Sequence, residues 1–112
     1  MVVATTTRRT PRVIRRMVDR IVERFHPEKV ILFGSHARGE ANADSDVDLL
    51  VVMPVRGSVR RKRVQVRMAL REPEVSKDIL ISRPDEFERY RGVVGTVEQV
   101  AASEGKVLYE RG

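Results

Sequence analysis

The amino-acid sequence predicts an α/β fold, and three observations support this prediction. Apolar residues recur at helical spacing between Val13 and Phe25. Three short runs rich in β-branched residues follow, each bounded by glycine, proline or polar residues, and they read KVILFG, VDLLVVM and VSKDILI. Helical patterns are interleaved with these runs along the chain, and such an alternation is typical of an α/β domain.

The first half of the chain predicts a helix and two strands. We expect the helix to begin with Thr10 as its N-cap and Pro11 at its first position, and to end near Pro27. The run 29–34 is too short for a helix and predicts a buried strand that stops at a glycine. The letters SHAR then predict a helical turn, and the run 47–53 predicts the second strand.

The middle of the chain predicts another helix and a third strand. Gly57 and Ser58 are expected to open a helix that runs to about Arg71, where the letters EPE break it. The run 75–81 predicts the third strand.

Two short helices and a strand or tail complete the chain. Pro84 is expected to start a helical turn. Thr96, with Gln99 three residues later, has the capping-box pattern that begins a helix. The run 106–110 predicts a last short strand or a tail.

Composition limits the class of protein. A chain of 112 residues predicts a single domain spanning 1–112. With 41% hydrophobic residues, 4% aromatic residues and no Trp, its core must be aliphatic. The absence of Cys excludes disulfides, thiolate metal sites and a Cys nucleophile. No apolar run approaches a membrane span and the start shows no signal-peptide pattern, so we expect a cytoplasmic protein without a membrane partner.

The net charge of +6 is concentrated in one stretch of the sequence. Residues 56–71, here called the basic segment, contain no acidic residue and seven basic ones: Arg56, Arg60, Arg61, Lys62, Arg63, Arg67 and Arg71. Such a segment is either a solvated helix face or a surface that binds a partner. Three of its members, Arg60, Arg63 and Arg67, share one predicted helix face, which we expect to lie away from the carboxylates described next.

Asp46 and Asp48 stand at the head of the second predicted strand. Residues two apart in a strand point to the same face, with Cα atoms roughly 7 Å apart, so the two carboxylates repel each other. A hard divalent ion such as Mg²⁺ takes oxygen ligands of this kind and would relieve the repulsion. The alternative is a pair of solvated caps or partners for the many arginines.

Asp78 lies within the third predicted strand. If that strand neighbours the second, a third carboxylate joins the site, and three acids can hold two ions about 4 Å apart, as in phosphoryl transfer. The alternative is a rim charge beside Lys77.

The Gly34-Ser35 pair follows a strand and opens a helical turn, which predicts a phosphate-binding turn. Glycine lets the backbone approach a phosphate, and free N–H groups and the hydroxyl supply donors. Arg38, one turn further, could add positive charge to the same anion, or could pair with Glu40 or Asp44 instead.

The letters GSHARG, followed five residues later by SDVDLLV, resemble the signature Gly-Ser-x-Ala-Arg-Gly…Ser-Asp-x-Asp-Leu of the minimal nucleotidyltransferases. These are a branch of the DNA polymerase β-like nucleotidyltransferase superfamily. The resemblance also includes the leading helix, the third acidic strand and the ending EGKVLYE, so it covers most of the chain.

The resemblance implies a polymerase β-like nucleotidyltransferase fold with a small mixed sheet flanked by helices. It implies a nucleoside triphosphate donor, expected to be ATP, and two Mg²⁺ ions held by Asp46, Asp48 and Asp78. Gly34, Ser35, Arg38 and Ser45 would bind the nucleotide. Larger relatives carry a helical domain that binds the acceptor, and this chain has no counterpart, so the acceptor is expected on another molecule.

Minimal nucleotidyltransferases are commonly paired with small helical HEPN proteins, often toxic RNases, as toxin-antitoxin modules. The resemblance therefore implies an antitoxin that transfers AMP to a tyrosine of a HEPN toxin. Two alternatives remain: a catalytically idle antitoxin that acts by binding alone, and a nucleic-acid-binding domain that uses the basic segment. The last lacks a helix-turn-helix, a zinc finger or an aromatic stacking pattern.

Overall fold

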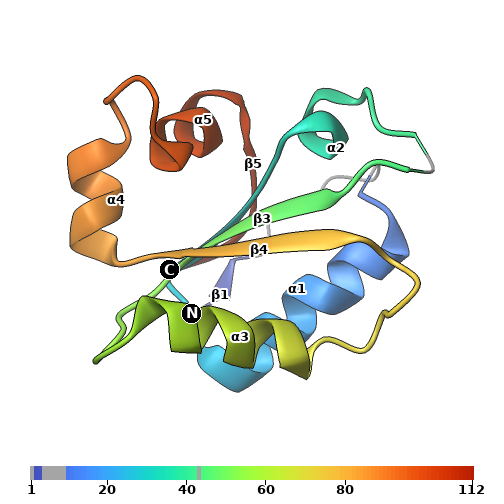
Figure 1. The fold of residues 1–112 in the computed structure, drawn as a ribbon, viewed down its shortest axis with the longest axis horizontal. Coiled ribbons are helices and arrows are strands. Elements are labelled where there is room, and N and C mark those ends of the chain that lie inside the picture. The colour runs from blue at the N-terminus through green and yellow to red at the C-terminus, as the bar shows by residue number, and fades with distance from the viewer. Residues whose placement is uncertain (1, 4–9, 43) are drawn as a thin grey trace.

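The fold is a mixed β-sheet between two layers of helices (Figure 1). A computed structural model describes residues 2–3, 10–42 and 44–112. In chain order the elements are β1 (Val2–Val3), α1 (Arg12–Phe25), β2 (Lys29–Phe33), α2 (Ser35–Arg38), β3 (Val47–Val52), α3 (Val59–Ala69), β4 (Lys77–Ser82), α4 (Pro84–Tyr90), α5 (Val97–Glu104) and β5 (Lys106–Arg111).

The sheet has the strand order β1-β5-β2-β3-β4. Strand β2 pairs antiparallel with both β3 and β5, and β1 pairs antiparallel with β5. The pairing of β3 with β4 is parallel, and α3 forms the crossover between them. The predicted α/β fold with a small mixed sheet is therefore confirmed.

Both faces of the sheet are covered by apolar packing. On one face, residues of α1 and α3 pack on side chains that include Leu49 and Val51 of β3. On the other face, α4 and α5 pack on side chains that include Leu50 and Val52. Because successive strand residues point to opposite faces, the continuous apolar run of β3 serves both layers.

The first helix begins one residue later than the sequence predicts. Its N-cap is Pro11 and no side chain caps it, so the prediction of Thr10 as N-cap was wrong. Thr10 is instead a buried residue, with 8% of its surface exposed. At the other end His26 adopts a left-handed conformation and its N–H donates to the Val22 carbonyl, which ends the helix.

The caps of the later helices follow the sequence more closely. Ser58 Oγ accepts a hydrogen bond from Arg61 N, and Thr96 Oγ1 accepts one from Gln99 N. The Gln99 side chain donates to Ser103 Oγ. Of the predicted capping box, the described residues therefore show only the hydrogen bond that the Thr96 side chain accepts. The last residue of helix α3 is Ala69, slightly before the end predicted at about Arg71.

The last predicted strand is a full member of the sheet, since β5 lies between β1 and β2. The two-residue strand β1 was not predicted. No helix in the described ranges is long and apolar enough to cross a membrane. The segment 4–9, part of the start in which the sequence shows no signal peptide, lies outside the described residues.

Candidate active site

The three predicted carboxylates come together at one end of strands β3 and β4. Asp48 is the second residue of β3 and Asp78 the second residue of β4, and the parallel register pairs them directly. Asp46 lies just before β3 begins and is exposed. On the other side of Asp48, antiparallel pairing places Phe33, the last residue of β2, opposite it. The fold therefore brings all three acids and the turn after β2 to the same edge.

The electrostatics show that burial and the neighbouring carboxylates act on Asp48. Partial burial raises the pKa of Asp48, and the negative charges of Asp78 and Asp46 raise it further. His36 and Arg38 oppose this rise in pKa. At Asp48, burial and the neighbouring carboxylates together outweigh the opposing effects of His36 and Arg38 on its pKa.

Two of the acids are engaged by neighbouring side chains. Asp78 Oδ1 accepts a hydrogen bond from Arg63 Nη2 of α3 at 3.1 Å. Asp46 Oδ1 accepts one from Ser76 Oγ, in the segment that leads into β4. Arg63 and Ser76 are thus site residues that sequence reasoning missed.

The three acids fit a divalent cation by chemistry and charge. Carboxylate oxygens are the ligands that Mg²⁺ takes, and a cation would neutralise the charge repulsion that, after burial, raises the pKa of Asp48. Within the described residues, however, no three His, Cys, Asp or Glu side chains already converge as a ligand group. Asp78 is turned to Arg63 and Asp46 to Ser76, so a cation would have to draw these carboxylates from their present partners.

Gly34 fits the turn beside Asp48 because it has no side chain. Its φ is +75°, and a Cβ at this position would overlap the Asp48 carboxylate. Its carbonyl accepts hydrogen bonds from the N–H groups of Ala37 and Arg38, both at 3.1 Å, and closes the short helix α2 that Ser35 begins. The predicted phosphate-binding turn therefore abuts the predicted metal ligand, while its phosphate role stays a prediction.

Arg38 forms ion pairs with acids on either side. Its Nε donates to Glu40 Oε1 at 2.7 Å, and its Nη1 lies 3.7 Å from Glu104 Oε1. The hydrogen bond that Arg38 donates to Glu40 is the largest cause of the raised pKa of Arg38. The ion-pair alternative is thus found with Glu40 and not with Asp44. Arg38 opposes the rise in the pKa of Asp48, so it belongs to the site electrostatically. Its binding of an anion remains a prediction.

Ser45 organises the loop that precedes β3. Its Oγ accepts a hydrogen bond from Asn42 N at 3.0 Å, and its own N–H donates to the Asn42 carbonyl at 3.1 Å. His36 Nε2 lies 3.3 Å from the Ser45 carbonyl and links this loop to α2. The implied contact of Ser45 with a nucleotide stays a prediction.

One expectation about the basic segment was wrong. We expected the helix face with Arg60, Arg63 and Arg67 to lie away from the carboxylates, yet Arg63 reaches Asp78. The reason is that β4 is an edge strand and α3 packs against it, so a long side chain on the flank of the helix can reach round that edge.

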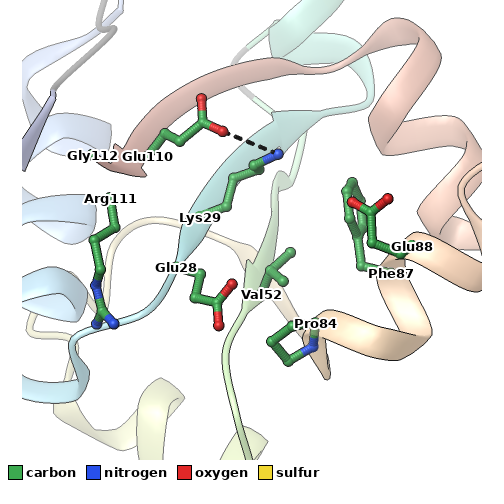
Figure 2. Close-up of a pocket in the computed structure, with 9 residues that line it drawn as sticks. All are labelled: Glu28, Lys29, Val52, Pro84, Phe87, Glu88, Glu110, Arg111 and Gly112. Atoms are coloured by element: carbon green, nitrogen blue, oxygen red, sulfur yellow. Dashed lines mark ion pairs between the residues drawn. The ribbon is translucent and has the colours of Figure 1, made fainter.

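Two cavities lie at opposite ends of the strands. One of about 250 Å³ is lined by residues that include His36, Ser45 and Ser76, the last of which donates a hydrogen bond to Asp46. The larger, about 490 Å³, is at the far end, where Lys29 faces Val52 across the sheet (Figure 2). There Lys29 Nζ lies 3.3 Å from Glu110 Oε2 and 5.2 Å from the centre of a phenylalanine ring. The larger cavity is therefore separate from the carboxylate site.

Comparison with known proteins points in one direction. Residues 14–101 match the family model described as nucleotidyltransferase domain. A protein of Methanocaldococcus jannaschii with the provisional name protein adenylyltransferase is 40% identical over 55 residues, which are 49% of this chain and 54% of that protein. The chain thus spans about half the length of this curated relative.

A solved structure supports the fold. The crystal structure of a protein from Sulfolobus solfataricus, provisionally described as a nucleotidyltransferase, aligns with a TM-score of 0.61 and 21% identity, covering 86% of this chain and 76% of that one. At this identity the likeness shows a shared fold alone.

Proposed function

Because the chain belongs to the nucleotidyltransferase domain family, we propose that it transfers a nucleotidyl group from a nucleoside triphosphate to a protein acceptor, with divalent metal ions. The observation that supports this most is the direct pairing of Asp48 with Asp78 across parallel strands, with Asp46 beside them. A nucleotidyl transfer site needs carboxylates that hold divalent metal ions for the triphosphate, and these three acids are the groups that would hold them.

Each residue of the site has a role in this proposal. Asp46, Asp48 and Asp78 would hold two Mg²⁺ ions, which when bound supply charge neutralisation for the triphosphate and activation of the acceptor oxygen. Gly34 leaves room for the Asp48 carboxylate beside the turn, and the Ser35 hydroxyl would donate to a phosphate oxygen. Arg38 and Ser45 flank the same turn and would contact the nucleotide.

The finer assignment is transfer of AMP from ATP to a tyrosine of a HEPN toxin, which would neutralise the toxin. Its support is the sequence resemblance to minimal nucleotidyltransferases and the provisional name of the Methanocaldococcus jannaschii relative, protein adenylyltransferase. In this reaction the tyrosine oxygen bonds to the α-phosphorus of ATP, the bond to the pyrophosphate oxygen breaks, and the tyrosine proton is lost to solvent.

The test combines the purified chain, Mg²⁺, each of the four ribonucleoside triphosphates and a HEPN protein encoded beside it. Intact mass spectrometry should show the HEPN protein gain the mass of one or more AMP units with ATP and not with the other triphosphates. Asp48→Asn should form the same complex without the mass gain. If the chain instead forms a stable complex and neutralises the toxicity of the HEPN protein without any change in its mass, the chain is a catalytically idle antitoxin that acts by binding alone.

The nucleic-acid alternative gains little from the structure. Base stacking needs exposed aromatic faces, but Phe33, Phe87 and Tyr109 are each at most 9% exposed. Phe25 lies beneath Lys62, with the Nζ 5.8 Å from the ring centre. The basic segment therefore offers charge without a stacking surface.

A further inference from the structure

The outer face of α3 has an apolar centre that the proposed transfer reaction does not use. The helix buries Val66 and Ala69 against the sheet. On the opposite side Val64 is 51% exposed and Met68 is 80% exposed. Because they are four residues apart, these two side chains are neighbours on the helix surface. An exposed aliphatic pair on a helix otherwise rich in arginine calls for an explanation.

Unpaired arginines surround this apolar pair. Arg60, Arg61 and Arg67 fall on the same side of the helix by its periodicity, and within the described residues none of them forms an ion pair, in contrast to Arg63. A hollow of about 490 Å³, lined by Ser58, Arg60, Arg61, Val64 and Gln65, adjoins the apolar pair. The surface thus has an apolar centre, a cationic rim and a recess.

We propose that the outer face of α3 docks an acidic amphipathic segment of a partner protein. The apolar residues of that segment would cover Val64 and Met68, and its carboxylates would meet Arg60, Arg61 and Arg67. A nucleic acid would satisfy the arginines but would leave the two aliphatic side chains against phosphates or water, so the pattern favours a protein.

The position of α3 connects this surface with the carboxylates. Arg63 lies on the flank of the same helix and contacts Asp78, so a partner bound to the outer face would lie beside the candidate active site. Identifying that partner as the acceptor of the nucleotidyl group rests on the proposed function. The docking of a partner on α3 does not.

The binding test uses a labelled synthetic helical peptide with leucines at i and i+4 flanked by glutamates. A peptide of the same composition in scrambled order and a short single-stranded RNA serve as competing probes. Fluorescence anisotropy at low and moderate salt, without nucleotide or metal, measures affinity. The wild type should bind the patterned peptide more tightly than either other probe, and added salt should weaken the binding.

Matched variants locate the binding surface. Met68→Ser and Arg60→Glu should each weaken binding about fivefold or more. Val94→Ser and Arg89→Glu are the controls, because Val94 is 88% exposed and Arg89 is an exposed arginine of α4, on the other side of the sheet. These two should bind like the wild type.

Three results would overturn the inference: equal affinity for the patterned and scrambled peptides, tighter binding of the RNA, or unchanged affinity of Met68→Ser. A chain that binds the peptide through α3 yet transfers no nucleotide would uphold the docking surface and contradict the proposed function, so the two failures are distinguishable.

Discussion

The guanidinium of Arg63 donates to the Asp78 carboxylate at 3.1 Å, and this contact joins the basic helix to the acidic edge of the sheet. Both side chains are close to half exposed, at 45% and 44%. An ion pair this exposed adds little to stability, typically below about 1 kcal/mol. Its significance lies in what it does to Asp78, because the guanidinium occupies an oxygen that a metal ion would need.

Replacing Arg63 should therefore strengthen metal binding. In Arg63→Gln a cation no longer competes with the guanidinium for Asp78, and we expect the Kd for Mn²⁺ to fall about two- to fivefold, in proportion to the weak pair that is lost. Isothermal titration of the nucleotide-free chain measures this Kd. Arg60→Gln removes the same charge from the same helix without touching Asp78, so its effect should be smaller. Equal effects of the two variants would show that only net charge matters.

Asp48 should make stability depend on pH in a defined direction. Its pKa is raised in the folded state, above the reference value of 3.8, first by burial and then by Asp78 and Asp46. The folded chain therefore binds this proton more tightly than the unfolded chain. At a pH above the folded-state pKa, Asp48 is ionised and lowers the free energy of unfolding. This destabilisation is relieved as the pH falls through the folded-state pKa toward 3.8, because the folded chain then takes up the proton.

Asp48→Asn removes that cost. In metal-free buffer at neutral pH the variant should unfold with a free energy about 0.5 kcal/mol above that of the wild type, and the difference should vanish as the pH approaches the unfolded pKa. Urea denaturation at several pH values measures it. Asp46→Asn keeps an acceptor oxygen for Ser76. Its free energy of unfolding should rise less than that of Asp48→Asn, because Asp46 is a smaller cause of the raised pKa of Asp48 than burial or Asp78. A difference that grows toward acid pH would contradict the assignment.

The same two substitutions should abolish transfer. Metal ions supply several kcal/mol of charge stabilisation in such reactions, so the loss of one ligand should lower kcat about 100-fold or more. The wild type should also melt at a higher temperature with Mg²⁺ and ATP than without them, and the variants should lose this gain. If both variants stay active, Asp46 and Asp48 are not metal ligands.

Gly34→Ala should destabilise the fold through both backbone strain and steric overlap, and a second substitution at Asp48 isolates the overlap. Gly34 and Gly39 both have φ of +75°, but a Cβ would overlap the Asp48 carboxylate only at Gly34, while at Gly39 nothing lies within 4 Å. The two backbones differ in ψ, which is 19° at Gly39, in the left-handed helical region, and −156° at Gly34, in a region that only glycine adopts readily. Gly39→Ala should therefore cost about 1 kcal/mol and Gly34→Ala about 2–4 kcal/mol, because both the backbone strain and the overlap are greater at Gly34. Thermal or urea unfolding compares them. Combining Gly34→Ala with Asp48→Ala should recover part of the loss, and strict additivity would contradict the overlap.

Local patterns in the sequence were sufficient to predict where most residues of this candidate site lie. Asp46 and Asp48 lie two residues apart, and Gly34 is set by a turn directly after a strand, so each depends on a few neighbouring residues. The sequence makes a third carboxylate at the site conditional on the strand of Asp78 neighbouring the strand of Asp48, and their parallel pairing meets this condition. This could be anticipated because both runs are short, apolar and separated by a helical crossover.

Long-range contacts between side chains were beyond such reasoning. Arg63 contacts Asp78 because α3 packs at the β4 edge, and no pattern along the chain selects it over the other arginines. The cap of α1 failed for a related reason: Thr10 has the better capping propensity, but the folded chain buries it instead. Strand β1 has two residues, too few to show any periodicity.

Ser35→Ala tests the phosphate-binding turn through kinetics. A hydroxyl that donates to the triphosphate throughout the reaction contributes equally to the ground state and the transition state, so its loss should raise KM for ATP and leave kcat nearly unchanged. A single hydrogen bond of about 0.5–1.5 kcal/mol corresponds to a rise in KM of about two- to tenfold. Ser103→Ala is the control, because Ser103 lies on α5 and its hydroxyl donates to the Gln99 carbonyl of the same helix. Steady-state rates over a range of ATP concentrations give both constants. A large fall in kcat at saturating ATP would mean that Ser35 acts on the transition state, and an unchanged KM would remove it from the nucleotide site.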